Sequence, residues 1–229
     1  ALEYLVQEKK HYQSGVDDAL LWLSAAMLFG GISFLTSAGE VANCLLAFVI
    51  SLYAALRFTD RVMATVAFLA LLGVIFFTAD QLGGMVKAIL PFILMAASAA
   101  IYFGIIYLKK QSGLKHYSSC FSVIRIASLL SFYAAGNFYV VKELSTQLYH
   151  LPAGNNTPIP FGWLFWIFTF IIPVSYIARG ILQKDTIFLR TGMLLMAALV
   201  FTVRYYYAIA PPEVIMTMGG ILLLIISYA

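Results

Sequence analysis

Long apolar runs alternate with short polar segments along the whole chain, and this alternation predicts transmembrane helices. A helix needs about 20 consecutive, mostly apolar residues to cross the hydrocarbon core of a bilayer. The approximate ranges of such runs are 19–36, 41–56, 62–79, 86–108, 119–141, 162–182, 187–209 and 213–229. The pattern therefore predicts an all-α polytopic integral membrane protein with eight transmembrane helices.

Composition supports a chain whose main partner is the lipid bilayer. Of the 229 residues, 62% are hydrophobic and 10% are charged, whereas a soluble domain carries roughly 25% charged residues. The net charge of +4 indicates a basic rim facing anionic lipid headgroups. We therefore expect no nucleic-acid partner.

The basic residues fall almost entirely on one side of the expected membrane. Ten of the fourteen Lys and Arg residues lie in the N-terminal segment and in the loops on that same side: Lys9, Lys10, Arg57, Arg61, Lys109, Lys110, Lys115, Arg179, Lys184 and Arg190. Short loops rich in Lys and Arg stay in the cytoplasm. We expect a multi-pass protein of the cell membrane with both termini cytoplasmic.

The pentapeptide Lys-His-Tyr-x-Ser occurs twice, at 10–14 and 115–119, each time before a long apolar run. A register of 105 residues relates the two copies, and an insertion of about 19 residues within 142–161 changes the later register to 124. These matches predict a duplication into two four-helix halves, 1–113 and 114–229. The halves would be parallel repeats related by an axis along the membrane normal.

The repeated motif has two interpretations. His11, Tyr12, His116 and Tyr117 suit the lipid headgroup layer, where rings and long stems reach both phases. Alternatively, the two histidines form a paired pH-sensing or metal-binding group. Two histidines without acidic or Cys neighbours make a weak metal site, so we expect no metal.

Polar side chains within the spans are the candidate ligand-binding residues, because such groups are costly in a bilayer. They are Arg125, Arg204 and Asn137. Arg125 either forms a structural pair with Asp17 or Asp18 or binds a small anionic solute between the halves.

Several residues that interrupt helices lie inside the predicted spans. Pro173 is the best candidate for a broken, transporter-like helix. Close helix packing is expected at most of the glycines, which include Gly30, Gly31, Gly73 and Gly104.

Enzyme signatures are mostly absent from the sequence. It contains no H-E-x-x-H, no G-x-S-x-G and no Gly-rich phosphate loop, so we expect no cofactor and identify no characterised family. Three functions remain open. The first is transport of a small solute or lipid through a site between the halves. The second is a non-catalytic membrane module that acts as a sensor, anchor or assembly partner, and the third is an intramembrane enzyme.

Overall fold

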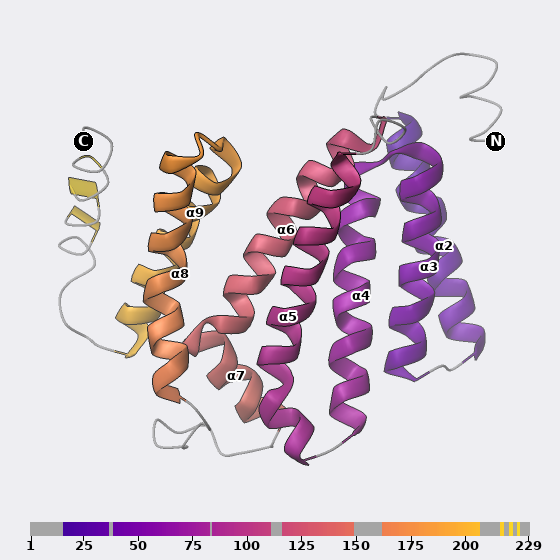
Figure 1. Cartoon of the computed structure of the whole chain (residues 1–229). Coiled ribbons are helices and arrows are strands. Elements are labelled where there is room, and N and C mark those ends of the chain that lie inside the picture. The colour runs from indigo at the N-terminus through magenta and orange to yellow at the C-terminus, as the bar shows by residue number, and fades with distance from the viewer. Residues whose placement is uncertain are drawn as a thin grey trace. The chain divides into compact units, whose positions relative to one another are not determined.

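The computed structural model describes residues 16–36, 39–82, 84–110, 116–148 and 162–206, with 216, 217, 220, 221 and 224. Eight α-helices are assigned in this part of the chain (Figure 1). The helices are α2 (Val16–Thr36), α3 (Glu40–Phe58), α4 (Arg61–Gln81), α5 (Gly84–Lys109), α6 (Ser118–Gly136), α7 (Phe138–Leu148), α8 (Gly162–Leu182) and α9 (Thr186–Tyr206).

Seven of the described helices are long and apolar enough to cross a membrane, and α7 is the exception. Their outward faces carry large apolar side chains, as at Phe34, which is 85% exposed. A bilayer accommodates such faces, and it favours helices because all their backbone hydrogen bonds are internal. The eighth expected span, 213–229, lies largely outside the described residues.

The chain divides into two compact units, Ala1–Ser128 and Leu129–Ala229. The sequence repeat placed a boundary earlier, between residues 113 and 114. That boundary concerns a duplication rather than compactness, so it stays a prediction. Each unit is described by itself below.

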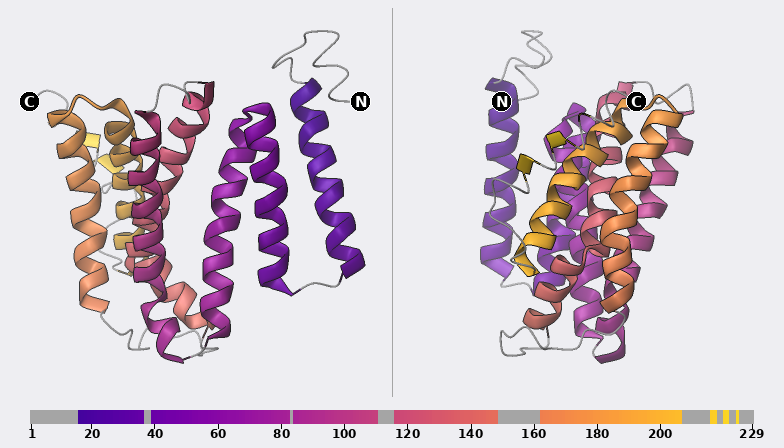
Figure 2. Two further views of the ribbon diagram at one scale, coloured as in Figure 1. Left: turned by 45° about the vertical axis from the view of Figure 1, so that its right-hand side comes forward. Right: turned by 90° about the vertical axis from the view of Figure 1, so that its left-hand side faces the viewer.

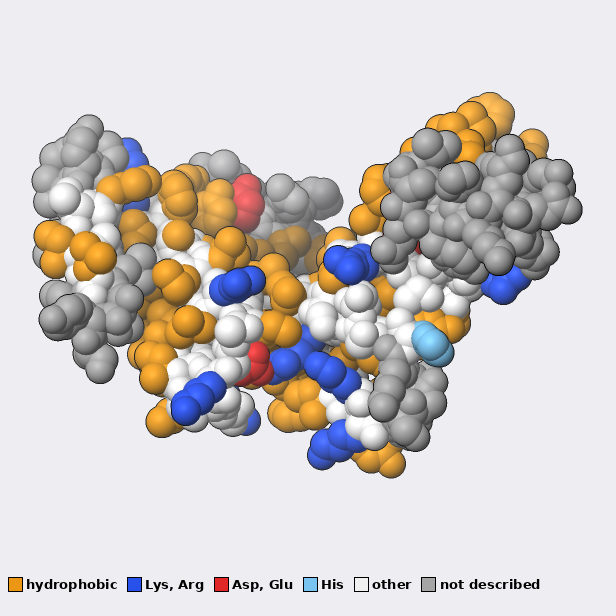
Figure 3. Space-filling view, turned by 90° about the horizontal axis from the view of Figure 1, so that it is seen from above, with side chains coloured by type: hydrophobic (Ala, Val, Ile, Leu, Met, Phe, Trp, Pro, Cys, Tyr) orange, Lys and Arg blue, Asp and Glu red, His pale blue; other side chains and the backbone are white. Residues whose placement is uncertain are grey.

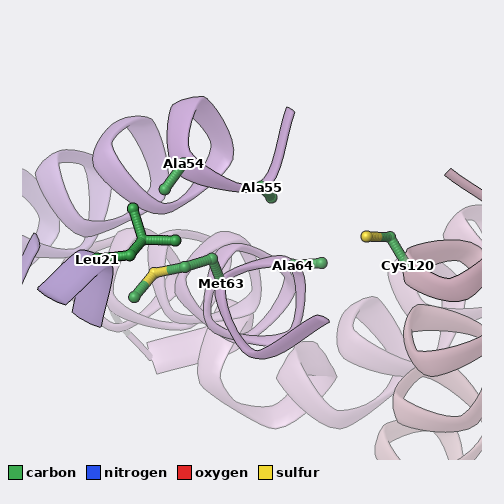
Figure 4. Close-up of a cluster of buried hydrophobic side chains, with 6 residues drawn as sticks. All are labelled: Leu21, Ala54, Ala55, Met63, Ala64 and Cys120. Atoms are coloured by element: carbon green, nitrogen blue, oxygen red, sulfur yellow. The ribbon is translucent and has the colours of Figure 1, made fainter. Parts of the chain in front are cut away.

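Unit 1 is built on helices that run alongside one another, with α2 beside α3, α3 beside α4 and α4 beside α5 (Figure 2, left). Ser33 of α2 donates to the Asn43 amide oxygen of α3 over 2.8 Å. A small buried cluster joins α2, α3 and α4 to the start of α6 (Figure 4). Its members are Leu21, Ala54, Ala55, Met63, Ala64 and Cys120. The alanines allow the helix backbones to approach closely.

The first turn of α6 is held against the turn between α3 and α4. Asp60 caps α4 by accepting from the Met63 N–H over 2.6 Å. The Tyr117 hydroxyl donates to the Leu56 carbonyl over 2.9 Å, and the Cys120 thiol approaches the Asp60 carbonyl at 3.6 Å. The second copy of the repeated motif therefore joins α6 to α3.

Basic side chains gather at this same end of unit 1 (Figure 3, blue). Arg57 and Arg61 flank the α3–α4 turn, and Lys109 and Lys110 end α5. In unit 2, the basic residues Arg179, Lys184 and Arg190 lie around the α8–α9 turn. Within each unit, basic residues cluster at a helix-connecting turn.

Unit 2 contains a tight antiparallel pair, α8 and α9. Lys184 turns the chain with a φ of 51°, and the Asp185 N–H donates to the Gly180 carbonyl over 3.0 Å. A Cβ on Gly180 would lie 2.7 Å from the Leu189 backbone nitrogen, and one on Gly192 would lie 2.8 Å from Ile177. Only glycine fits these two positions without a shift. Gly30, Gly31 and Gly104 have open space around them instead, so the close packing expected there is not found.

Candidate functional site

The helix that begins at Ser118 ends at Gly136, although the apolar pattern predicted one span over 119–141. The next helix, α7, begins at Phe138, so only Asn137 separates the two. The Phe138 N–H donates to the Thr169 hydroxyl of α8 over 3.0 Å. The prediction of one continuous span over 119–141 is therefore wrong. The Thr169 hydroxyl of the neighbouring helix accepts from the Phe138 N–H, so the chain can leave the α6 helix at this point.

Asn137 caps the first turn of α7. Its Oδ1 accepts from the Tyr139 N–H over 2.9 Å and from the Val140 N–H over 3.4 Å, which is the usual role of an N-cap asparagine. This use of the oxygen fixes the orientation of the amide. The Nδ2 group consequently donates to the Tyr133 hydroxyl at 2.9 Å and to the Thr202 hydroxyl at 3.1 Å.

These side chains form what we call the Asn137 cluster: Tyr133, Asn137, Thr169 and Thr202. All four are at most 5% exposed, and they join α6, α8 and α9. Thr169 donates to the Phe165 carbonyl over 2.7 Å, and Thr202 donates to the Ala198 carbonyl over 3.0 Å. Thr169 is seven residues into α8, or about 10 Å along the helix axis. The cluster therefore lies within the apolar part of the helices.

An open groove of about 570 Å³ lies beside the cluster, between α6, α7 and α9. It is lined by Leu130, Tyr133, Ala134, Asn137, Tyr139, Val140, Leu195, Ala198, Phe201, Thr202 and Tyr205. The lining is overwhelmingly apolar, and its polar groups are hydroxyls and one amide. Ligand pockets in proteins typically occupy about 300–1,000 Å³ with a few convergent polar groups, and the groove fits that description.

Aromatic pairs stiffen the surroundings of the groove. The rings of Tyr139 and Tyr205 meet edge to face at 4.8 Å between centroids. On the α8 side, Phe138 stacks on Trp166 at 4.9 Å. These contacts hold the first two residues of α7 against α8 and α9.

The described residues that line the groove include no charged side chain. Within the described ranges, no group of three or more His, Cys, Asp and Glu residues is placed to hold a metal ion. Neutral hydroxyl and amide groups bind a ligand by hydrogen bonding, and they are poor acids and bases near neutral pH.

The three candidate ligand-binding residues have different places. Asn137 is in the cluster and lines the groove. Arg204 is exposed in the last turn of α9, beside the lining residue Tyr205. Arg125 belongs to unit 1, where its guanidinium lies 5.6 Å from the centre of the Tyr102 ring.

The residues expected to be structural are only partly described. Asp18 is half-buried in α2. His116 is exposed and lies just before the start of α6. His11 and Tyr12, and the side chain of Asp17, lie outside the described residues. The pairing of Arg125 with an aspartate, and the pH-sensing or metal-binding alternative for the histidines, stay predictions.

Sequence reasoning did not find most of the cluster. It favoured Pro173 as the helix break, yet α8 runs through Pro173 without interruption. It also gave Tyr133, Thr169 and Thr202 no role. The available signal was the Gly136-Asn137 pair, since glycine is common at helix C-termini and asparagine at N-caps.

Comparison with protein-family models, curated proteins and solved structures gave no match to this chain. Its class rests on the helices themselves. Seven of the described ones have the length and apolar composition to cross a membrane. The chain is an α-helical, multi-pass membrane protein.

Proposed function

We propose that this protein binds a single-chain amphiphile in the groove between α6, α7 and α9 and transports it across the bilayer. The observation that carries the proposal is an apolar groove of about 570 Å³ beside a polar cluster at a break between helices. An acyl chain suits the apolar lining, and a polar head suits its hydroxyl and amide groups. Transporters commonly place their substrate sites at such discontinuous helices.

The α6–α7 break favours transport over static binding. Side-chain hydroxyl and amide groups, rather than the α6 backbone, accept the N–H groups of Phe138, Tyr139 and Val140. Such caps can exchange partners while the helices stay intact, as hinge residues do in domain closure. Movement at Asn137 would widen or narrow the groove.

The uncharged lining favours an amphiphile over the small anionic solute expected from Arg125. The site between two pseudo-symmetric halves, with Arg125 as an anion-binding group, stays a prediction. If the groove binds no amphiphile, the two alternatives from the sequence remain: a non-catalytic membrane module and an intramembrane enzyme.

The finer architecture belongs to the same proposal. We place the protein in the cell membrane with eight spans in a four-plus-four parallel repeat and both termini in the cytoplasm. Support comes from the recurrent pentapeptide and from the basic residues around the α3–α4 and α8–α9 turns.

Thiol labelling in cells tests the orientation. In a Cys44→Ala, Cys120→Ala background, Lys184→Cys should react with a membrane-impermeant maleimide only after permeabilisation. Trp163→Cys, at the opposite end of α8 and 67% exposed, should react in intact cells. The reverse pattern would contradict the proposed orientation.

Filling the groove should stop transport. Ala198 lines the groove and Ala197 beside it is exposed, so Ala198→Trp should slow transbilayer movement about tenfold or more because the indole occupies the acyl-chain space. Ala197→Trp should stay within about twofold of the natural protein. The assay uses proteoliposomes that contain acyl-lysophosphatidylcholine with an NBD label on its chain. Dithionite quenches only the label in the outer leaflet, so the rate of fluorescence loss reports movement across the bilayer.

Equal rates for empty liposomes and proteoliposomes would refute transport. If another part of the protein fills the groove, Ala198→Trp should lower the unfolding temperature. Lysophosphatidylcholine should then stabilise neither the natural protein nor the variant, and binding in the groove would be refuted.

A further inference from the structure

Among the described residues, the hydrogen bonds of the Asn137 cluster leave one donor beside the groove without an acceptor. Asn137 uses Oδ1 to cap α7, so Nδ2 must face Tyr133, and the Tyr133 oxygen must accept. A phenol that accepts from an amide still has its own O–H to donate. Within the part of the chain that the structure describes, this O–H donates no hydrogen bond, and the Tyr133 hydroxyl takes part only as an acceptor from Asn137.

The other polar groups of the cluster are already in use. The Thr202 hydroxyl donates to the Ala198 carbonyl, and the Thr169 hydroxyl donates to the Phe165 carbonyl. The amide of Asn137 donates to two hydroxyls and accepts from two backbone N–H groups. Tyr133 is therefore the group of the cluster that can donate a hydrogen bond to a ligand.

Tyr133 is 4% exposed and lines the groove. A buried hydroxyl without an acceptor is costly, and a bound acceptor would recover that cost. Because most of the lining is apolar, with hydroxyls and one amide as its polar groups, we expect the acceptor to be carried by a largely apolar molecule. The carbonyl of an acyl ester, next to a long alkyl chain, meets both requirements.

We propose that the groove selects acyl-ester lipids with one chain, and that the Tyr133 O–H donates to their ester carbonyl. This inference rests on the proposed function and names its substrate class. It also suggests why the donor is useful for transport. An ester carbonyl that leaves the headgroup region loses its hydrogen bonds to water, and the Tyr133 O–H would replace one of them.

A matched pair of ligands isolates the carbonyl. Acyl- and alkyl-lysophosphatidylcholine of equal chain length differ in having an ester or an ether at the glycerol. The experiment measures displacement of the NBD-labelled acyl probe from the full-length protein in nanodiscs, with each unlabelled lipid as competitor. The natural protein should bind the acyl lipid about fivefold more tightly than the alkyl lipid, as expected for one neutral hydrogen bond.

Tyr133→Phe should remove this preference. Affinity for the acyl lipid should fall about fivefold, to the level of the alkyl lipid, and affinity for the alkyl lipid should stay within about twofold. The control is Tyr53→Phe, which alters an exposed tyrosine of α3 outside the groove lining and should keep the acyl preference. If Tyr133 has a purely structural role, Tyr133→Phe should weaken the binding of both lipids equally.

The outcomes separate the two proposals. Equal binding of ester and ether to the natural protein overturns the carbonyl inference, and this comparison needs no variant to fold. An ester preference that survives Tyr133→Phe overturns it as well. In either case, weaker binding of both lipids by Ala198→Trp would leave the groove and its function standing. Binding of neither lipid, or binding that Ala198→Trp does not change, refutes the proposed function itself.

Discussion

Replacing Gly180 by alanine should destabilise the protein by about 2 kcal/mol, although alanine is the better helix former. The added Cβ would lie 2.7 Å from the Leu189 backbone nitrogen and 3.0 Å from its Cα. Backbone atoms cannot rotate away as a flexible side chain can, so α8 and α9 must separate. The measurement is the free energy of unfolding in mixed micelles, or the apparent melting temperature where unfolding is irreversible.

The same substitution at Gly104 is the matched control. Gly104 also lies within a long helix, but no atom is within 4 Å of its added Cβ. Gly104→Ala should keep or raise stability, by up to about 1 kcal/mol, through helix propensity alone. If both alanines raise stability, the close approach of α8 and α9 at Gly180 is wrong.

Asn137→Leu should cost about 3 kcal/mol, since it removes the cap of α7 and leaves buried polar groups unsatisfied. The backbone N–H groups of Tyr139 and Val140 lose their acceptor. The variant should also lose helical signal from the first turn of α7, which hydrogen exchange at these amides would report.

Asn137→Ser separates the two functions of this side chain. A serine can still cap α7, but it is too short to reach both Tyr133 and Thr202. Its loss of stability should therefore lie between those of the natural protein and Asn137→Leu. If serine costs as much as leucine, bonding to the two hydroxyls rather than capping dominates.

The helices were predictable because a bilayer leaves little choice. The run expected over 162–182 is α8 to the residue, and 187–209 became α9 with its start displaced by one. Apolar length decides such elements, since lipid offers no partner for an unpaired backbone group. Seven of the eight predicted spans correspond to described helices, and the eighth lies largely outside the described residues.

The break at Asn137 was not predictable by the same means. It depends on the Thr169 hydroxyl, 31 residues further along the chain, accepting from the Phe138 N–H. Pro173 was a misleading signal, because membrane helices tolerate proline where neighbouring groups compensate. Asn137 itself was a candidate, but only as an isolated polar residue. Its hydrogen bonds to Tyr133 and Thr202 could not be predicted without knowing that α6 and α9 lie side by side.

Glycine shows the same limit. Sequence reasoning expected helix contacts at Gly30, Gly31 and Gly104 and did not name Gly180 or Gly192. What distinguishes them is the neighbour: α9 approaches Gly180, and α8 approaches Gly192, whereas the other three have open space. A contact between helices depends on which helix lies opposite each glycine, and a single sequence does not show that.

The stacking of Trp166 on Phe138 provides an optical signal within the protein. The chain has three tryptophans. Trp22 and Trp163 are 41% and 67% exposed, so brominated lipids will quench their emission by direct contact. Trp166 is held against the first residue of α7. Its emission, once the two exposed indoles are quenched, follows the break between α6 and α7 without any attached dye.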